Sequence, residues 1–252
     1  MREATRAARK PSSRPAEAGL ARLAFAAFMV VAGGAAAHLA PSTIREEVLQ
    51  PGALRVTFAI PAGYTGATPV PLVVALHFAG KVTPFFGKEY LTALVEPGLR
   101  ELGAVIVAPD CRGRDWTDPV SEADVLELVD EAMRAYRIDP ARVLLTGYSM
   151  GAMGTWYLAA RHQDRFSAAL VVSGLPPAGA AELDWRIPLY VIHSRDDERL
   201  LLKPTADVVK QLAANGRNVR LVVVDGLTHY QVPGFVPYLR AAVPWLKRAW
   251  RR

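Results

Sequence analysis

Short apolar segments alternate with amphipathic segments along most of this chain, and this alternation strongly limits the folds that it can adopt. From about residue 53 onward, short runs of apolar residues are followed by stretches in which apolar residues recur at helical spacing. Continuous apolar runs are typical of parallel strands that are buried on both faces. Strands of this kind that alternate with helices predict an α/β fold, in which helices cover both faces of a mostly parallel sheet.

The expected elements follow one another without an internal repeat or a sign of a second domain. Strands are expected at 54–60, 72–77, 104–108, 142–146, 168–172, 189–193 and 219–224, and helices at 89–102, 123–136, 150–161, 205–214 and 237–249. The first strand (LRVTFAI) alternates in character, which indicates an edge strand. Pro97 is expected to kink the first helix, and Gly103 to end it. The residues SEAD at 121–124 have the pattern of a capping box, which predicts the start of the second helix.

The first 37 residues differ from the rest of the chain. They carry six basic and two acidic side chains, and they end in the uncharged run LAFAAFMVVAGGAAA at 23–37. A basic segment, an apolar run and small residues in this order are typical of a secretory signal peptide, with cleavage expected at Ala35–Ala37. The run is shorter than the roughly 20 residues of a spanning helix, and an uncleaved membrane anchor is the alternative. Residues 1–37 are therefore predicted to be a signal peptide or an N-terminal membrane anchor, and residues 38–252 to be exported to the periplasm or the cell exterior.

Charge and motif content narrow the range of partners. The formal net charge is +6, but residues 1–37 account for +4 of it (six basic minus two acidic), so the other 215 residues carry only +2. A nucleic-acid partner is therefore not expected, and membrane contact is expected only if the N-terminal segment is uncleaved. The sequence contains neither G-x-G-x-x-G nor a Walker-type G-K-[ST], which argues against nucleotide binding. Cys111 is the only cysteine, so no intrachain disulfide can form. No cofactor and no metal are predicted, and the oligomeric state stays open.

The segment TGYSMGAMGT, residues 146–155, carries the strongest functional motif. Its residues GYSMG match G-x-S-x-G, the turn that presents a nucleophilic serine. The pattern is short enough to arise by chance, so its position matters. It lies between the strand expected at 142–146 and the helix expected at 150–161, which is the junction that such a turn requires. Gly147 and Gly151 lack a Cβ atom and would let the flanking chains approach closely. The motif, its position and these glycines together predict that Ser149 is a nucleophile.

A serine hydroxyl is a weak nucleophile until a base takes its proton and a third group orients that base. His229 follows the last expected strand, and it is the only one of the five histidines in that position. It is therefore the predicted base. Three adjacent carboxylates follow the strand at 189–193, namely Asp196, Asp197 and Glu198. The residues alone do not distinguish which of them orients the histidine. His77 and His193, at the ends of other strands, are expected to make structural hydrogen bonds.

The serine turn, the loop HSRDDE at 193–198 and the loop THY at 228–230 together resemble the α/β-hydrolase superfamily. The resemblance is to single-domain bacterial serine esterases related to the phospholipase/carboxylesterase, dienelactone-hydrolase and polyhydroxybutyrate-depolymerase-like groups, and it extends over about residues 54–246. It implies an α/β-hydrolase fold for residues 38–252. The interval 173–187 is too short for the lid domain that many lipases insert there. Dienelactone hydrolases use a cysteine nucleophile where this chain has serine, so their chemistry is not expected.

The same resemblance assigns roles to individual residues. In esterases of these groups, the strand before the triad acid ends in the pattern His-Gly-x-x-Asp. This pattern places Asp197 at the position of the triad acid, with Asp196 as the alternative. The chain departs from the pattern by a serine where the glycine is usual. The oxyanion hole needs two main-chain N–H groups. One belongs to the residue after the nucleophile, here Met150. The other maps onto Ala79, with Phe78 as the alternative because it replaces the usual glycine.

The predicted function is hydrolysis of carboxylic esters through a Ser-Asp-His triad and an acyl-enzyme intermediate. A site without a lid domain favours small or aryl esters as substrates. A peptidase or an acyltransferase with the same triad is the alternative. A non-catalytic binding protein on the hydrolase scaffold is a third hypothesis, but such proteins typically lose a triad member, whereas Ser149, Asp197 and His229 are all present.

Overall fold

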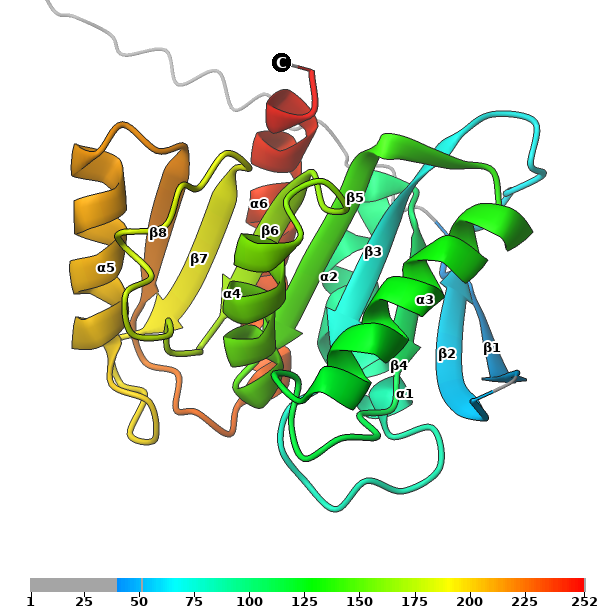
Figure 1. Cartoon of the computed structure of the whole chain (residues 1–252), viewed down its shortest axis with the longest axis horizontal. Coiled ribbons are helices and arrows are strands. Elements are labelled where there is room, and N and C mark those ends of the chain that lie inside the picture. Colours follow the sequence, from blue (N-terminus) through cyan, green and yellow to red (C-terminus); the bar gives the residue numbers. More distant parts are fainter. Residues whose placement is uncertain (1–39, 51, 252) are drawn as a thin grey trace, which may run out of the picture. The chain divides into compact units, whose positions relative to one another are not determined.

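A sheet of eight strands lies at the centre of the computed structural model, which describes residues 40–50 and 52–251 (Figure 1). The strands are β1 (Thr43–Leu49), β2 (Leu54–Ile60), β3 (Val70–Leu76), β4 (Val105–Pro109), β5 (Ile138–Tyr148), β6 (Ala168–Val172), β7 (Leu189–Ser194) and β8 (Val219–Val224). Their order across the sheet is β1-β2-β4-β3-β5-β6-β7-β8. β2 is antiparallel to both of its neighbours, and every other neighbouring pair is parallel. The predicted mostly parallel sheet is confirmed.

Helices cover both faces of the sheet. One face carries α3 (Pro119–Ala135), α4 (Met150–Arg161) and α5 (Leu202–Ala214), and the other carries α1 (Gly87–Tyr90), α2 (Glu96–Leu99) and α6 (Val236–Ala249) (Figure 1). Leu145 of β5 packs in the same core as Trp156 of α4, whereas the adjacent Leu144 belongs to the core that contains Leu246 of α6. The two cores are separate because successive residues of a strand point to opposite faces.

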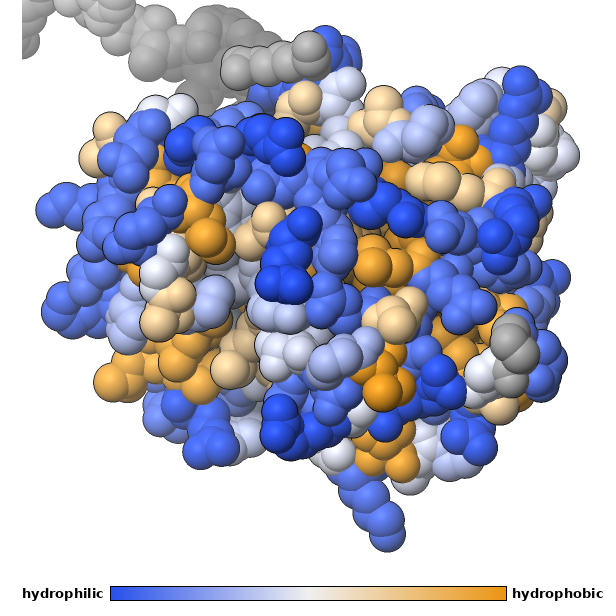
Figure 2. Space-filling model, in the orientation of Figure 1, coloured by the Kyte–Doolittle hydropathy of each residue, from blue (hydrophilic) through white to orange (hydrophobic). Residues whose placement is uncertain are grey.

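The solvent-facing side of the layer formed by α3, α4 and α5 is mainly polar. Figure 2 shows the face of α3, α4 and α5, on which hydrophilic residues predominate and hydrophobic residues are scattered. Val120 of α3 and Met153 of α4 are among the exposed apolar side chains. This distribution is typical of amphipathic helices whose apolar side packs on a sheet.

The helix expected at 89–102 is a composite of four short helical pieces. Between α1 and α2 lies a π-helical turn, η1 (Leu91–Val95), and after α2 comes a 3-10 turn, η2 (Arg100–Leu102). Pro97 lies in the first turn of α2, directly after the π-helical turn. A proline has no N–H to complete the helical hydrogen-bond ladder, so the helical pattern changes beside it. Gly103 ends the segment with φ 63°, as expected.

Two other expectations from the sequence are wrong. The strand at 54–60 was expected at an edge, but β1 pairs with it and forms the edge itself. β1 (TIREEVL) is mostly exposed and lacks an apolar run, so it gives no signal of a buried strand. The capping box at 121–124 does not start α3. That helix begins at Pro119, where the Asp118 side chain accepts the N–H of Val120 at 3.0 Å, and Ser121 is buried inside the helix.

The predicted leader, residues 1–37, lies outside the described residues, as does its assignment to a signal peptide or anchor. In the described part of the chain, no helix combines the length and apolar character needed to cross a bilayer.

The parallel strands bring distant loops to one edge of the sheet. The carboxyl ends of β3, β5, β7 and β8 all lie at the lower edge in Figure 1. Loops that follow parallel strands therefore meet there, as is usual for ligand sites in open α/β sheets. The interval between β6 and β7, residues 173–188, contains neither helix nor strand.

Candidate active site

Ser149 lies in a tight turn between β5 and α4. Its backbone has φ 54° and ψ −116°, in the region of positive φ that non-glycine residues rarely adopt. A Cβ atom at Gly147 would lie 2.1 Å from the carbonyl oxygen of Gly151, and one at Gly151 would lie 1.9 Å from the carbonyl oxygen of Leu76. The close approach expected at both glycines is confirmed. Backbone strain of this kind clusters at functional sites.

Two hydrogen bonds connect Ser149, His229 and Asp197. Nε2 of His229 lies 2.9 Å from Oγ of Ser149, and Nδ1 of the same ring lies 2.8 Å from Oδ2 of Asp197. A carboxylate can only accept, so Nδ1 carries the proton, and in the neutral ring Nε2 accepts the hydrogen bond of the serine hydroxyl. Asp197 and His229 are buried, whereas Ser149 is partly exposed. The hydroxyl is therefore the part of this chain of hydrogen bonds that a substrate can reach.

The structure distinguishes the adjacent carboxylates of the loop after β7. Oδ1 of Asp197 accepts two main-chain N–H groups of the following turn, at 3.0 and 2.7 Å. Asp196 is exposed, and its Oδ2 accepts the N–H of Gly226 at 2.6 Å. Asp197 is thus the carboxylate that the fold brings to the His229 ring, whereas Asp196 joins the two loops at a different point.

Two other buried histidines hold the loops around this site. Nδ1 of His77 donates to the carbonyl oxygen of Phe78 at 2.7 Å, and its Nε2 accepts the N–H of Cys111 at 3.1 Å. Nε2 of His193 donates to the carbonyl oxygen of Leu200 at 2.6 Å. Burial lowers the pKa of both rings, so both are neutral at neutral pH. Their expected structural role is confirmed.

The main chain of His229 is also held by side chains. The hydroxyl of Tyr148 donates to the carbonyl oxygen of His229 at 2.7 Å, and Oε2 of Glu198 accepts the N–H of His229 at 2.9 Å. Burial raises the pKa of Tyr148 well above its usual range, so its hydroxyl stays protonated and donates. Sequence reasoning missed both contacts. Tyr148 was a variable position of the serine motif and Glu198 one of three acidic residues, and neither forms a recognisable pattern with a main-chain partner.

A cavity of about 410 Å³ opens beside Ser149. Its wall includes Ser149 and His229, and both candidates for the second oxyanion donor, Phe78 and Ala79, line it as well. Its volume lies within the range of about 300–1,000 Å³ that is usual for small-molecule sites. Met150, the other expected donor, is the first residue of α4. The first N–H groups of a helix have no partner within the helix.

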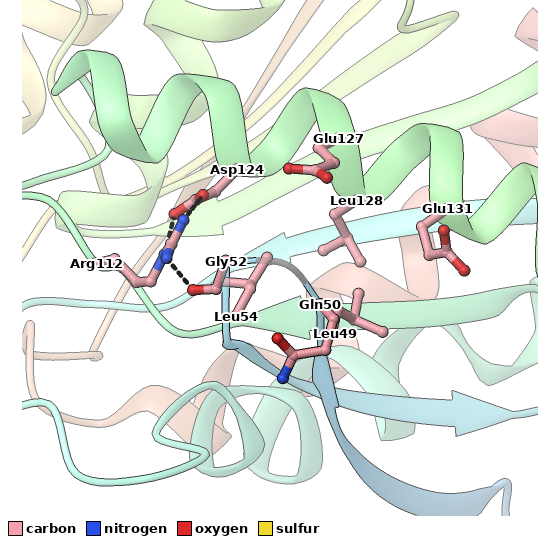
Figure 3. A pocket seen from close by; sticks show the side chains of 9 residues that line it. All are labelled: Leu49, Gln50, Gly52, Leu54, Arg112, Asp124, Glu127, Leu128 and Glu131. Carbon is pink, nitrogen blue, oxygen red and sulfur yellow. Dashed lines mark hydrogen bonds and ion pairs between the residues drawn. The ribbon is translucent and has the colours of Figure 1, made fainter.

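A second hollow lies between α3 and the turn that joins β1 to β2 (Figure 3). The Arg112 guanidinium lies in its wall and donates to the carboxylate of Asp124 and to the carbonyl oxygen of Gly52. Its volume of about 20 Å³ suits a single water, so it is a packing feature. Over residues 40–50 and 52–251, no group of three His, Cys, Asp or Glu side chains is arranged to hold a metal ion.

Comparison with known proteins finds that this chain is similar to esterases and related hydrolases. Poly(3-hydroxyalkanoate) depolymerase C of Paucimonas lemoignei is 28% identical over 167 residues, which cover 61% of this chain and 39% of the depolymerase. The bifunctional acetylxylan esterase/xylanase XynS20E of Neocallimastix patriciarum is 30% identical over 76 residues, which cover 30% of this chain and 11% of that protein. Each match therefore spans less than half of the relative's length.

The fold and a family model agree with these matches. The crystal structure of a thermostable esterase superposes with a TM-score of 0.68 and 22% sequence identity, over 82% of this chain and 62% of that chain. Residues 86–216, which are 131 of the 252 residues, match the model of the α/β-hydrolase fold. That stretch contains β5, the serine turn and α4 together with the acid-bearing loop after β7. By this match the chain belongs to the α/β-hydrolase fold family, as its sequence motifs predicted.

Proposed function

We propose that this protein is a serine hydrolase that cleaves carboxylic esters, with Ser149 as nucleophile, His229 as base and Asp197 as the group that orients the base. The observation that carries the proposal is the pair of hydrogen bonds from the His229 ring, 2.9 Å to Ser149 and 2.8 Å to Asp197. The turn that holds Ser149 supports it, because it places the hydroxyl at the wall of a cavity.

The reaction proceeds in two halves. Oγ of Ser149 attacks the ester carbonyl carbon while its proton moves to Nε2 of His229, and Asp197 stabilises the imidazolium that forms. The carbonyl oxygen becomes an oxyanion, which the N–H groups of Met150 and Ala79 stabilise. The alcohol leaves with the proton from His229, and the acyl group remains on Ser149. Water then attacks the acyl-enzyme, His229 takes and returns a proton in the same way, and the carboxylic acid is released.

The substrates we propose are small or aryl esters. The cavity volume of about 410 Å³ supports this proposal, as does the absence of helix and strand from residues 173–188 beside the site. The names of the two relatives, a bifunctional acetylxylan esterase/xylanase and a poly(3-hydroxyalkanoate) depolymerase, also support it.

Hydrolysis of p-nitrophenyl acetate and butyrate by the full chain and by the Ser149→Ala variant tests the proposal. The wild-type protein is expected to release p-nitrophenol, and the variant is not. A p-nitroanilide of the same acyl group separates a peptidase from an esterase. Product analysis with an added alcohol separates an acyltransferase, because a new ester would then replace the free acid. Equal rates for the wild-type protein and Ser149→Ala would exclude Ser149 as the nucleophile.

We also propose that residues 1–37 direct export, either as a cleaved signal peptide or as an anchor. Their order of basic, apolar and small residues supports this proposal. The N-terminal sequence and the cell fraction of the expressed full chain test it. A cytoplasmic protein that begins at Met1 would contradict it.

A further inference from the structure

His229 is held by four hydrogen bonds that come from two pairs of consecutive residues. Tyr148 and Ser149 form one pair. The tyrosine hydroxyl donates to the His229 carbonyl oxygen at 2.7 Å, while the serine Oγ lies 2.9 Å from ring atom Nε2. Asp197 and Glu198 form the other pair. The aspartate bonds ring atom Nδ1 at 2.8 Å, while the glutamate accepts the main-chain N–H at 2.9 Å. Each pair thus contacts both the ring and the backbone of the same histidine.

We propose that Tyr148 and Glu198 are positioning residues that fix the main chain of His229 relative to the nucleophile and the acid. The proposal rests on the proposed function and goes beyond it, because the hydrogen bonds of both residues go to main-chain atoms of His229 and not to the reacting atoms. In this proposal, Tyr148 and Glu198 set the distances from the His229 ring to Ser149 and to Asp197.

The location of His229 explains why side chains are needed for this task. It lies in the loop between β8 and the 3-10 turn η3 (Val232–Phe235), outside helix and strand. A buried peptide group that does not belong to a ladder must find other hydrogen-bond partners. His229 is buried, and side chains from the end of β5 and from the loop after β7 supply both partners. Its backbone is therefore fixed to the serine turn and to the acid loop rather than to its own strand.

The covalent bonds within each pair complete two closed rings. A shift of the serine turn moves Ser149 and the Tyr148 anchor together, and a shift of the acid loop moves Asp197 and the Glu198 anchor together. The ring of His229 also packs against the Tyr148 ring, with centroids 5.6 Å apart. Relative motion of the three reacting groups is thus restricted at the backbone as well as at the side chains. Proton transfer depends steeply on such placement.

The chain offers a matched control for the Glu198 contact. Oδ2 of Asp196 accepts the N–H of Gly226 at 2.6 Å. This bond joins the same two loops through the same kind of groups, but it does not involve His229. A general loosening of the loops would appear in Asp196→Ala, whereas misplacement of the base would appear only in Glu198→Ala. Tyr157→Phe serves in the same way for Tyr148→Phe, because the Tyr157 hydroxyl bonds to Glu122 and neither residue lines the cavity beside Ser149.

The experiment measures kcat, KM and the pH profile of kcat/KM for p-nitrophenyl butyrate hydrolysis by the full chain. Tyr148→Phe and Glu198→Ala are expected to lower kcat by about 10- to 100-fold because they displace the base. KM should change little, because Glu198 does not line the cavity and Tyr148→Phe keeps the ring that does. Asp196→Ala and Tyr157→Phe are expected to keep kcat. Glu198→Gln is expected to recover most of the activity, because its amide oxygen accepts the same N–H, and to leave the pH profile unshifted.

Two results would overturn the proposal while the wild-type protein is active and Ser149→Ala is inactive. One is an unchanged kcat in both Tyr148→Phe and Glu198→Ala. The other is a Glu198→Gln variant that is as slow as Glu198→Ala or has a shifted pH profile, because the carboxylate charge would then matter and not its position. Inactive wild-type protein, or active Ser149→Ala, would instead contradict the proposed function.

A measurement that does not depend on catalytic turnover tests the positioning role even if the wild-type protein is inactive. The proton in the hydrogen bond between His229 and Asp197 is expected to give a downfield resonance in the proton NMR spectrum. Asp196→Ala is expected to keep this resonance, and Tyr148→Phe and Glu198→Ala are expected to broaden or lose it. Unchanged spectra in the last two variants would overturn the positioning role. Tyr148→Phe and Glu198→Gln preserve side-chain shape, and circular dichroism checks that each variant is folded.

Discussion

Oγ of Ser149 lies 2.9 Å from Nε2 of His229, although 80 residues separate them in the chain. The strand order of the sheet produces this contact, because β5 and β8 are parallel and end at the same edge. The contact makes the hydroxyl the expected point of covalent chemistry.

Ser149→Ala is expected to lower kcat for ester hydrolysis by at least about 10⁴-fold, because no other group replaces the attacking oxygen. Steady-state rates with p-nitrophenyl acetate measure the loss. Mass spectrometry of the wild-type protein after reaction with a fluorophosphonate should find the label on Ser149. A label on any other residue would contradict the assignment.

Asp197→Asn is expected to lower kcat by about 10⁴-fold, because an amide at this position favours the wrong tautomer of the His229 ring. Asp196→Asn is the matched control, and it should stay near the wild-type rate because the side chain bonds Gly226 instead. Kinetics of both variants with the same ester check the prediction. A comparable loss in the two variants would leave the choice of acid unsupported.

Gly151→Ala is expected to destabilise the fold by more than about 2 kcal/mol, because the added Cβ would lie 1.9 Å from the carbonyl oxygen of Leu76. Gly103→Ala is the comparison. That glycine has φ +63° and open space around it, so the change should cost only about 1 kcal/mol for the left-handed backbone. Urea unfolding of the two variants gives both values, and equal stability of the two would be inconsistent with the crowded turn.

Stability is expected to fall as the pH decreases below about 6.5, the pKa of an unperturbed histidine. Burial lowers the pKa of His77 and His193 in the folded state, so the unfolded chain binds more protons in this range, and stability rises with pH. Thermal unfolding at pH 5, 6, 7 and 8 measures the slope. His193→Gln, which retains an N–H donor for the Leu200 carbonyl, should have a flatter profile. An identical slope in wild type and variant would assign the effect to other groups.

Arg112→Ala is expected to lower the free energy of unfolding by about 1–3 kcal/mol, because it leaves the buried carboxylate of Asp124 without its guanidinium partner. Arg114→Ala is the control from the same loop. Its side chain is 82% exposed and lies 3.4 Å from Asp115, so its loss should have almost no effect. Chemical denaturation of both variants measures the difference, and a larger loss at Arg114 would contradict it.

Local chemistry explains which parts of the fold could be predicted from the sequence. The strands β6 and β8 and the helix α4 were predicted with the bounds that the structure has. All five residues of β6 are buried, and burial on both faces leaves a continuous apolar signal. β1 has no such signal, since it is exposed and paired on one side only. The start of α3 was placed too late because two capping patterns overlap, and the Asp-Pro pair at 118–119 is the one that is used.

In the candidate site, too, the local sequence predicts some residues and not others. Ser149 could be predicted because its glycines and its strand-to-helix position are features of the local sequence. The choice between Asp196 and Asp197 depends on the direction in which each side chain leaves the loop. In the structure Asp197 also accepts two main-chain N–H groups of the following turn, whereas Asp196 bonds Gly226. Tyr148 and Glu198 could not be found, because their partners are main-chain atoms of a residue far along the chain.

Because of the interval from 173 to 188, evolution or design could alter access to the candidate site independently of the proposed chemistry there. It begins beside the serine turn, where the N–H of Ser149 bonds to the carbonyl oxygen of Val172, and it returns to the sheet at β7 without supplying a member of the hydrogen-bonded chain. If the proposed function is correct, a segment inserted there would lie next to the site without displacing Ser149, His229 or Asp197. The range of substrates and the proposed catalytic groups would then be encoded in different stretches of the same edge.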